Sequence, residues 1–323
     1  MIRKLIRSAL RILIAVALVL FIAWGIVAQP SFRRNPVSTE KVDPARLRRH
    51  VEQLSREFHP RNFLHPENLD RCAEYIALHF GQAGAAVEIQ PFTVAGRQFR
   101  NVIGRFGSGC GPRIIVGAHY DACGDTPGAD DNASGVAALL ELAFLLGRHP
   151  PARDVELVAW SLEEPPFFKT DSMGSAVHAR SIAAGKTNIL GVIVLEMVGT
   201  FSDRWGSQAY PVPLLHLIYP NRGNFIGVIG RWDQGEWIKA VKTGMQGRTS
   251  LPVYSIRAPV QVPGIDLSDH LNYWLLGLPA LMVTDTAFYR NPAYHSPDDT
   301  AERLDYDRLA DVVVALAAAL HNL

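Results

Sequence analysis

The alternation of short, apolar, β-rich runs with helical patterns is the feature that most constrains the fold of this chain. The β-rich runs lie at residues 87–94, 102–106, 113–118, 155–162, 191–195, 225–229, 252–256 and 279–283. Helical patterns occupy residues 43–58 and 66–84 ahead of them, and 133–146, 175–184, 234–245 and 304–320 among and after them. Strands that alternate with helices predict an α/β fold, in which helices cover both faces of a central, largely parallel sheet.

The N-terminus carries an apolar segment that we expect to be a membrane anchor. Residues 12–28 contain no charged side chain, and four basic residues precede them. As a helix, this stretch would span roughly 26 Å, near the lower limit for crossing a bilayer. The basic flank should stay in the cytoplasm, which places the rest of the chain on the periplasmic or extracellular side. A cleaved signal peptide followed by secretion is the alternative, although Trp24 and Ile26 fit a cleavage site after Ala28 poorly.

The remaining chain is expected to form one domain. We assign residues 1–29 to the anchor or signal, residues 30–42, which contain Pro30 and Pro36, to a linker, and residues 43–323 to the folded domain. Roughly 280 residues are enough for one large core. The first 50 residues carry a net charge of +8 and the remainder −7, so the folded part is mildly acidic. Nucleic acid is therefore not an expected partner.

The three cysteines, Cys72, Cys110 and Cys123, lack the paired spacing of a structural zinc site. In an exported domain they allow one disulfide and one free thiol, with Cys110 and Cys123 as the nearer pair. A catalytic thiol has less support, since no partner residues are arranged around any cysteine. The chain also lacks a GxSxG elbow and a glycine-rich phosphate loop.

Polar residues follow directly on four of the apolar runs. "RIIVGAHYD" ends in His119 and Asp121, "VELVAWSLEE" in Glu163 and Glu164, "GVIVLE" in Glu196, and "PALMVTD" in Asp285. Ligand sites of open α/β sheets lie beyond the carboxyl ends of the strands. We therefore expect these side chains to converge.

Each of these residues also has a structural interpretation. A lone His119 is more often a buried core histidine, but Asp121 can accept a hydrogen bond from its second ring nitrogen, as the carboxylate partners of metal-bound histidines do. Asp131, beside Asp130 and Asn132, precedes a helical pattern and serves equally well as a helix N-cap or as a ligand.

The glutamates are harder to explain as solvated residues. Glu163 and Glu164 lie between an apolar run and "PPFF", and Glu196 lies inside "VIVLEMVGT". Carboxylates in such surroundings must be paired, protonated or metal-bound, because burying a bare charge is too costly. His295 lies in a turn-rich loop and would be unremarkable alone.

Together these residues provide two histidines and three carboxylates for metal, with one carboxylate to spare. Nitrogen and oxygen ligands without thiolates suit zinc. With one bridging carboxylate, such a set can hold two ions about 3.5 Å apart and leave an open position on each.

Residues 116–142, 156–175, 192–199 and 268–300 resemble the di-zinc aminopeptidases of metallopeptidase family twenty-eight, which also includes glutamate carboxypeptidase II, the transferrin receptor ectodomain and glutaminyl cyclase. The resemblance covers nearly all of the chain beyond about residue 43. It implies one zinc exopeptidase-like α/β domain, with a mixed, mostly parallel sheet of about eight strands.

The resemblance also implies residue roles. His119 and Glu196 would bind one Zn²⁺, Glu164 and His295 the other, and Asp131 would bridge the two ions. Glu163 would be the general base and Asp121 would orient His119. Two segments depart from the family pattern: Glu196 replaces a frequent aspartate, and "PPFFKTD" replaces a glycine-rich stretch beside the expected substrate pocket. "SDH", at residues 268–270, matches the family and is expected to support the ligands or contact substrate.

The expected function is hydrolysis of peptides, most simply by an aminopeptidase. One alternative is a glutaminyl cyclase-like transferase that uses a single zinc, and another is a non-catalytic binding module on the same fold. Retention of every ligand argues against the binding module. Side-chain preference and oligomeric state stay open.

Overall fold

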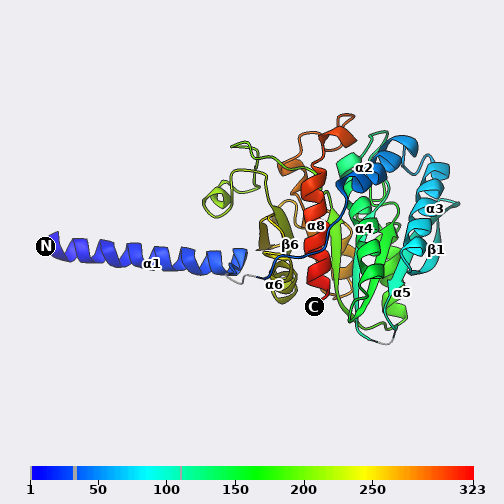
Figure 1. Cartoon of the computed structure of the whole chain (residues 1–323). Coiled ribbons are helices and arrows are strands. Elements are labelled where there is room, and N and C mark those ends of the chain that lie inside the picture. Colours follow the sequence, from blue (N-terminus) through cyan, green and yellow to red (C-terminus); the bar gives the residue numbers. More distant parts are fainter. Residues whose placement is uncertain (1, 32–34, 110) are drawn as a thin grey trace.

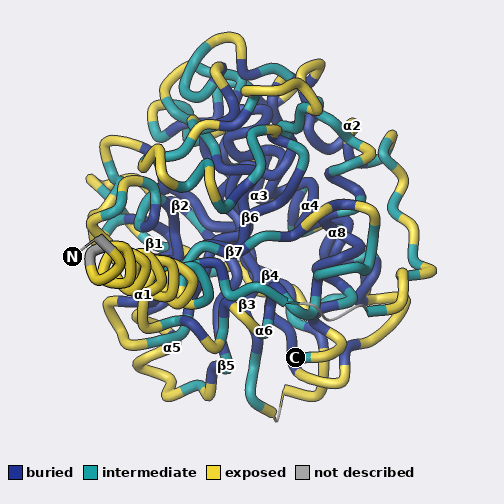
Figure 2. Tube along the Cα trace, turned by 90° about the vertical axis from the view of Figure 1, so that its left-hand side faces the viewer, coloured by how far each residue is buried: buried dark blue, intermediate teal, exposed yellow. Residues whose placement is uncertain are grey.

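The computed structural model describes residues 2–31, 35–109 and 111–323. A long helix, α1 (Ile2–Ala28), projects from an α/β domain that contains the rest of the described chain (Figure 1). Residues Ile6–Ala28 are apolar enough, and form a long enough helix, to cross a membrane. Figure 2 shows α1 nearly end-on and exposed over most of its length, whereas Ala28 at its end is buried.

The domain is built on one eight-stranded sheet with the order β1-β2-β4-β3-β5-β8-β6-β7. Strands β4, β3, β5 and β8 run parallel to one another in its centre, and β7 is parallel to β6. The β1–β2, β2–β4 and β6–β8 pairs are antiparallel. The predicted mixed, mostly parallel sheet is confirmed, and each β-rich run of the sequence corresponds to one strand. The strands are β1 (Ala86–Val94), β2 (Arg97–Phe106), β3 (Arg113–His119), β4 (Asp154–Trp160), β5 (Ile189–Glu196), β6 (Ile226–Arg231), β7 (Val253–Ala258) and β8 (Ala280–Thr284).

Helices cover both faces of the sheet, as expected. One face packs against α2 (Pro44–Glu52), α3 (Pro66–Gln82), α4 (Gly135–Arg148), α6 (Gly235–Met245) and α8 (Tyr306–Leu320). The other packs against α5 (Gly174–Ala184) and the short α7 (His270–Trp274). Helix α4 is buried along most of its length, which explains its nearly uninterrupted apolar sequence.

The helical pattern at residues 43–58 covers α2 and the π-helical turn Gln53–Glu57 that continues it. The sequence did not indicate α7 or the other single-turn elements. These are a π-helical turn at Ala129–Ser134 and 3₁₀ turns at Pro213–Leu217, Trp232–Gln234, Ala287–Tyr289 and Ala301–Arg303. Such short elements leave too little periodicity to be recognised.

The end of α1 is fastened to the edge of the sheet. The carbonyl oxygen of Ala28 accepts hydrogen bonds from Ser255 Oγ on β7 at 2.9 Å and from Lys242 Nζ on α6 at 3.2 Å. Asn35 Nδ2 donates to the carbonyl oxygens of Thr243 and Gln246 at 2.6 and 2.9 Å. Ala28 and Asn35 therefore both lie against α6.

Glu156 of β4 is a buried charge within the sheet. Arg105 Nε donates to its Oε2 at 2.7 Å, Arg113 also donates to Oε2, and His178 Nε2 lies 3.2 Å from Oε1. Although burial opposes its charged form, His178, Arg113 and Arg105 together lower the pKa of Glu156 to about 2. Removing one member of such a cluster leaves the others uncompensated.

We predict that Glu156→Gln lowers the free energy of unfolding by about 3 kcal/mol, measured by denaturant unfolding of the solubilised chain. Because the folded-state pKa is depressed, this contribution is fully present above pH 4.5 and disappears as the pH falls towards 2. Glu88→Gln is the matched control, since Glu88 also pairs with Arg105 but is 49% exposed. It should change stability by less than about 1 kcal/mol. Equal effects of the two substitutions would contradict this account.

Candidate metal centre

The parallel strands at the centre of the sheet bring the predicted ligands to one edge. His119 is the last residue of β3 and Glu196 the last residue of β5. Glu163 and Glu164 follow shortly after the end of β4, which is parallel to β3. The convergence expected from the sequence therefore follows from the strand directions.

Asp131 lies between the two histidines. Its Oδ1 is 3.4 Å from His119 Nε2, and its Oδ2 is 3.1 Å from His295 Nε2. The residue belongs to the π-helical turn ahead of α4, and its peptide bond to Asn132 is cis. Asn132 Oδ1, rather than Asp131, accepts the hydrogen bond from Gly135 N at the start of α4. Asp131 is therefore free of the N-cap role that the sequence had left open.

A second carboxylate completes each half of the arrangement. Glu196 Oε2 is 3.4 Å from His119 Nε2, and Glu164 Oε2 is 3.3 Å from His295 Nε2. The potential ligand atoms of His119, Asp131 and Glu196 all lie within 4.8 Å of one another. All five predicted ligands are thus together, as two groups joined by Asp131; their binding of metal stays a prediction.

The electrostatics of the cluster fit a divalent cation. Burial raises the pKa of Glu163 well above its usual range, that of Glu164 to about 7, and that of Glu196 in the same direction. Burial opposes the charged form of each histidine, but the surrounding carboxylates raise the pKa of His119 well above its ordinary value and that of His295 to about 10. The carboxylates of the cluster outnumber its two histidines, so the electrostatics fit a divalent cation. Nitrogen and oxygen donors of this kind suit zinc.

Asp121 connects the two strand ends. Its Oδ1 lies 3.5 Å from His119 Nδ1, which makes no hydrogen bond, so the orienting role stays a prediction. Its two oxygens also accept hydrogen bonds from the backbone N–H groups of Glu163 at 3.1 Å and Glu164 at 3.0 Å. One carboxylate can therefore position an expected ligand and hold the turn that carries the other two acids.

Three positions around the cluster have a left-handed backbone. Leu162, just before Glu163, has φ 63°; Met197, just after Glu196, has φ 47°; and His295 itself has φ 51°. Non-glycine residues in this region cost on the order of 1–3 kcal/mol each and concentrate at functional sites. The surrounding structure imposes these conformations to aim the neighbouring side chains.

Several supporting residues escaped the sequence analysis. Asp130 Oδ1 accepts a hydrogen bond from Gly199 N at 2.9 Å, and Asp299 accepts from the backbone N–H groups of Asp130 and Asp131 at 3.0 to 3.1 Å. Arg61, which is fully buried, donates to the carbonyl oxygens of Tyr120 and Gly128 at 3.0 and 2.8 Å. The only sequence signal was the doubling of aspartates in "GADDN" and "SPDDT".

Asp285, the fourth strand-end acid of the sequence, has structural contacts beside the cluster. It follows β8, but it is in neither group of potential ligands among the described residues. Its Oδ2 accepts from Thr200 N at 2.8 Å and its Oδ1 from Ala287 N at 2.9 Å. Asp285 therefore fastens the loops next to the cluster.

The three residues of the "SDH" segment have different surroundings. Ser268 Oγ donates to Glu196 Oε2 at 2.6 Å, which supports an expected ligand. Asp269 is fully buried, and burial raises its pKa to about 7. His270 Nε2 instead lies 2.7 Å from the carbonyl oxygen of Ile265, and burial lowers the pKa of this histidine to about 4.

Cys123 lies closer to the cluster than its sequence position indicated. Its Sγ and the ligand atoms of Glu164 and His295 are all within 4.8 Å of one another. Burial raises the pKa of this thiol to about 12. Cys72 and Cys123 are free thiols, and Cys110 lies outside the described residues, as does the disulfide that the sequence allowed.

Sequence comparison decides the family. The model of Peptidase family M28 matches residues 101–320, more than half of the chain. The chain belongs to peptidase family M28. The resemblance stated from its motifs is therefore confirmed, and the matched residues lie within one α/β domain.

Two relatives illustrate the range of similarity. The uncharacterized protein YfbL of Escherichia coli (strain K12) is 45% identical over 302 residues, which cover 91% of this chain and 93% of YfbL. Aminopeptidase YwaD of Bacillus subtilis (strain 168) is 25% identical over 210 residues, 65% of this chain and 40% of YwaD. This chain thus spans nearly the full length of YfbL but well under half of YwaD.

Solved structures share the fold. A leucine aminopeptidase precursor from Bacteroides thetaiotaomicron matches with a TM-score of 0.67 and 20% identity, over 89% of this chain and 99% of that chain. A glutaminyl cyclase from the same organism, bound to N-acetylhistamine, also gives a TM-score of 0.67 and 20% identity, over 88% and 99%. The fold is therefore common to hydrolases and transferases.

We predict that Ser268→Ala weakens zinc binding by roughly 10- to 100-fold, because the hydroxyl that holds Glu196 Oε2 is lost. The measurement is competition for zinc with a chelator of known affinity. Ser250→Ala, at an exposed serine bonded to Asp311, is the control and should leave the affinity unchanged. Unchanged zinc affinity in both variants would remove Ser268 from the site.

Proposed function

We propose that the chain is an aminopeptidase that binds two Zn²⁺ ions, with its catalytic domain at residues 43–323. The observation that carries this proposal is the position of Asp131, whose two carboxylate oxygens face different histidines, each beside its own glutamate. His119 and Glu196 would hold one ion, Glu164 and His295 the other, and Asp131 both. The family membership and the similarity to an aminopeptidase support the same reaction class.

Zinc and the protein side chains would contribute different steps of the proposed reaction. Zinc in this setting acts as a Lewis acid and brings the pKa of a water molecule near neutrality. Glu163 is assigned the role of general base, because burial raises the pKa of its carboxyl and so makes its carboxylate a better proton acceptor. Glu163 takes a proton from the attacking water and passes it to the departing amine. Asp121 holds the backbone of Glu163 in place.

Recognition of a free N-terminus follows from the surplus of acids. Asp269 is buried near His119 and Glu196, and its charged form is opposed by burial and by the neighbouring carboxylates. A protonated α-amino group would relieve that repulsion. This favours an exopeptidase that removes N-terminal residues from peptides.

A glutaminyl cyclase-like transferase with one zinc is the second candidate, because a solved cyclase shares the fold. The two groups of ligands around Asp131 favour hydrolysis, since a cyclase of this kind needs only a single ion. A binding module is less favoured, because all the expected ligands are present and close together. Metal stoichiometry separates the first two candidates.

We further propose that α1 stays attached and anchors the enzyme, with the catalytic domain outside the cytoplasm. The bonds from Lys242 and Ser255 to Ala28 make the end of α1 part of the domain's packing. The intact mass of the chain extracted from membranes should therefore include residues 1–29. A mass that begins after residue 28, with the protein in the soluble fraction, would show signal cleavage instead.

We predict that Glu163→Gln retains two zinc ions but lowers kcat for leucine p-nitroanilide by roughly 10²- to 10⁴-fold, since only the proton acceptor is lost. Asp131→Asn should lose both zinc and activity, because it weakens the shared ligand. Metal content per chain and initial rates give the two readouts. Glu67→Gln, at a glutamate that is 66% exposed, is the control.

The alternatives give different results in the same assays. One zinc per chain, no nitroanilide hydrolysis and cyclisation of an N-terminal glutamine peptide would identify the transferase. No metal after reconstitution would leave the binding module. Full activity of Glu163→Gln would assign the base elsewhere.

A further inference from the structure

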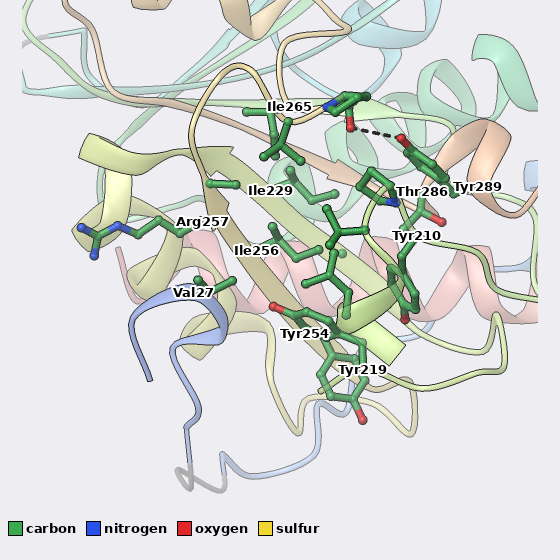
Figure 3. Close-up of a pocket in the computed structure, with 18 of the residues that line it drawn as sticks. Val27, Tyr210, Tyr219, Ile229, Tyr254, Ile256, Arg257, Ile265, Thr286 and Tyr289 are labelled. Atoms are coloured by element: carbon green, nitrogen blue, oxygen red, sulfur yellow. Dashed lines mark hydrogen bonds between the residues drawn. The ribbon is translucent and has the colours of Figure 1, made fainter. Parts of the chain in front are cut away.

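A cavity of about 800 Å³ is lined both by Glu196 of the candidate metal centre and by the end of α1 next to the domain. Figure 3 shows a close-up of this cavity. Glu196, Thr284 and Tyr294 line its inner end, and Trp24 and Val27 of α1 form part of its outer wall. A cavity of this size accommodates a drug-sized ligand and is far larger than a single amino-acid side chain.

The walls between these two ends are apolar. Ile229 of β6, Ile256 of β7 and Ile265 point into the cavity, whereas Arg257 points away from it (Figure 3). Three lining tyrosines use their hydroxyl groups internally. Tyr210 donates to Pro220 O at 2.8 Å, Tyr219 to Ser255 O at 2.6 Å, and Tyr289 to Pro263 O at 3.3 Å.

The outer end of the cavity is bordered by exposed apolar side chains on the same side as α1. Leu214 and Leu217, from the 3₁₀ turn Pro213–Leu217, are 57% and 82% exposed, and Trp232 is 43% exposed. All three also line the cavity. This rim continues the apolar surface of α1, a helix able to cross a bilayer, so lipid is the phase that would cover it.

The lining distinguishes between possible occupants. A peptide segment laid along these walls would lose hydrogen bonds to water from its backbone N–H and C=O groups and would leave those groups unpaired, which is unfavourable. A hydrocarbon chain has no such groups, and its transfer into apolar surroundings is favourable. The lining therefore favours a hydrocarbon chain over a peptide segment.

We propose that the preferred substrates are amides with a long hydrocarbon chain on the carbonyl side of the scissile bond, drawn into the cavity from the bilayer. This inference rests on the proposed function and on retention of α1. An aminopeptidase binds a single residue on the carbonyl side of the scissile bond, and a bounded cavity suits that residue. The peptide on the other side of the bond needs an open path to leave. The hydrocarbon chain is the side chain of an N-terminal residue, whose free α-amine the proposed aminopeptidase would recognise.

The reaction is ordinary amide hydrolysis. The oxygen of water adds to the carbonyl carbon, the C–N bond breaks, and the nitrogen leaves as an amine after receiving a proton. The products are a long-chain carboxylate and the amine. No oxidant, reductant or second substrate besides water is needed.

The test uses the full-length, zinc-loaded chain in phospholipid nanodiscs and two series of p-nitroanilides. One series carries 2-aminobutanoyl, 2-aminooctanoyl and 2-aminododecanoyl groups; the other carries the same chains without the amine. We expect kcat/KM to rise at least tenfold from four to twelve carbons in the series with the amine, since each buried methylene favours binding. Hydrolysis of only the series without the amine would refute the aminopeptidase and, with it, this inference.

Cavity variants separate binding in the cavity from simple partitioning into lipid. Ile256→Trp should lower kcat/KM for the twelve-carbon substrate to the value for the four-carbon substrate. Val262→Trp, which fills the cavity from a loop, is the second variant in case the first does not fold. Leu78→Trp, at a side chain on α3 that is 57% exposed and outside the cavity, is the matched control and should keep the full rise.

The outcomes that overturn the inference are distinct from those that overturn the function. Hydrolysis of four-carbon substrates with no rise, or a rise that survives in folded cavity variants, refutes the hydrocarbon site and leaves the aminopeptidase. A preference that instead follows apolar residues on the leaving side identifies a peptide occupant and also refutes it. No hydrolysis of any substrate by the zinc-loaded chain refutes the proposed function and the inference together.

Discussion

Repulsion among buried carboxylates at the carboxyl edge of β3, β4 and β5 is the constraint on which the surrounding structure depends. Each supporting acid is compensated by donors from the backbone. Asp121 accepts from Glu163 and Glu164, Asp299 from Asp130 and Asp131, and Asp130 from Gly199. These hydrogen bonds favour the charged form, although burial still raises the pKa of Asp130, and that of Asp299 to about 7. These contacts position acids that would otherwise move apart, and they leave an arrangement that a divalent cation would stabilise.

The sequence was informative wherever periodicity or a local burial conflict was present. Eight β-rich runs predicted eight strands, because residues buried on both faces of a parallel sheet must be apolar along the whole run. Acids and a histidine at the ends of those runs predicted a convergent site, because parallel strands end at the same edge. Asp131 remained ambiguous, since an N-cap and a ligand look alike in sequence; the capping hydrogen bond of Asn132 resolves that ambiguity.

What the sequence could not predict depends on contacts between distant segments. Asp285 matches the strand-end pattern as well as Glu196 does, yet it bonds the backbone of Thr200 and Ala287. Cys123 is close to Glu164 and His295 only because the loop after β3 folds back over the cluster. The cavity is also beyond sequence reasoning, since its walls come from α1, β6, β7 and several loops. The loop at residues 165–171, expected beside the substrate pocket, contributes none of the described lining residues.

The attachment of α1 to α6 and β7 has a consequence for how the domain samples its surroundings. If α1 lies across a bilayer, the hydrogen bonds of Ala28 and Asn35 set both the height and the tilt of the sheet above the lipid surface. A domain on a slack tether would tumble and present every face to the membrane in turn. A domain fastened at the strand edge keeps one face towards the lipid, and its encounters with membrane-dissolved molecules become a search in two dimensions rather than three.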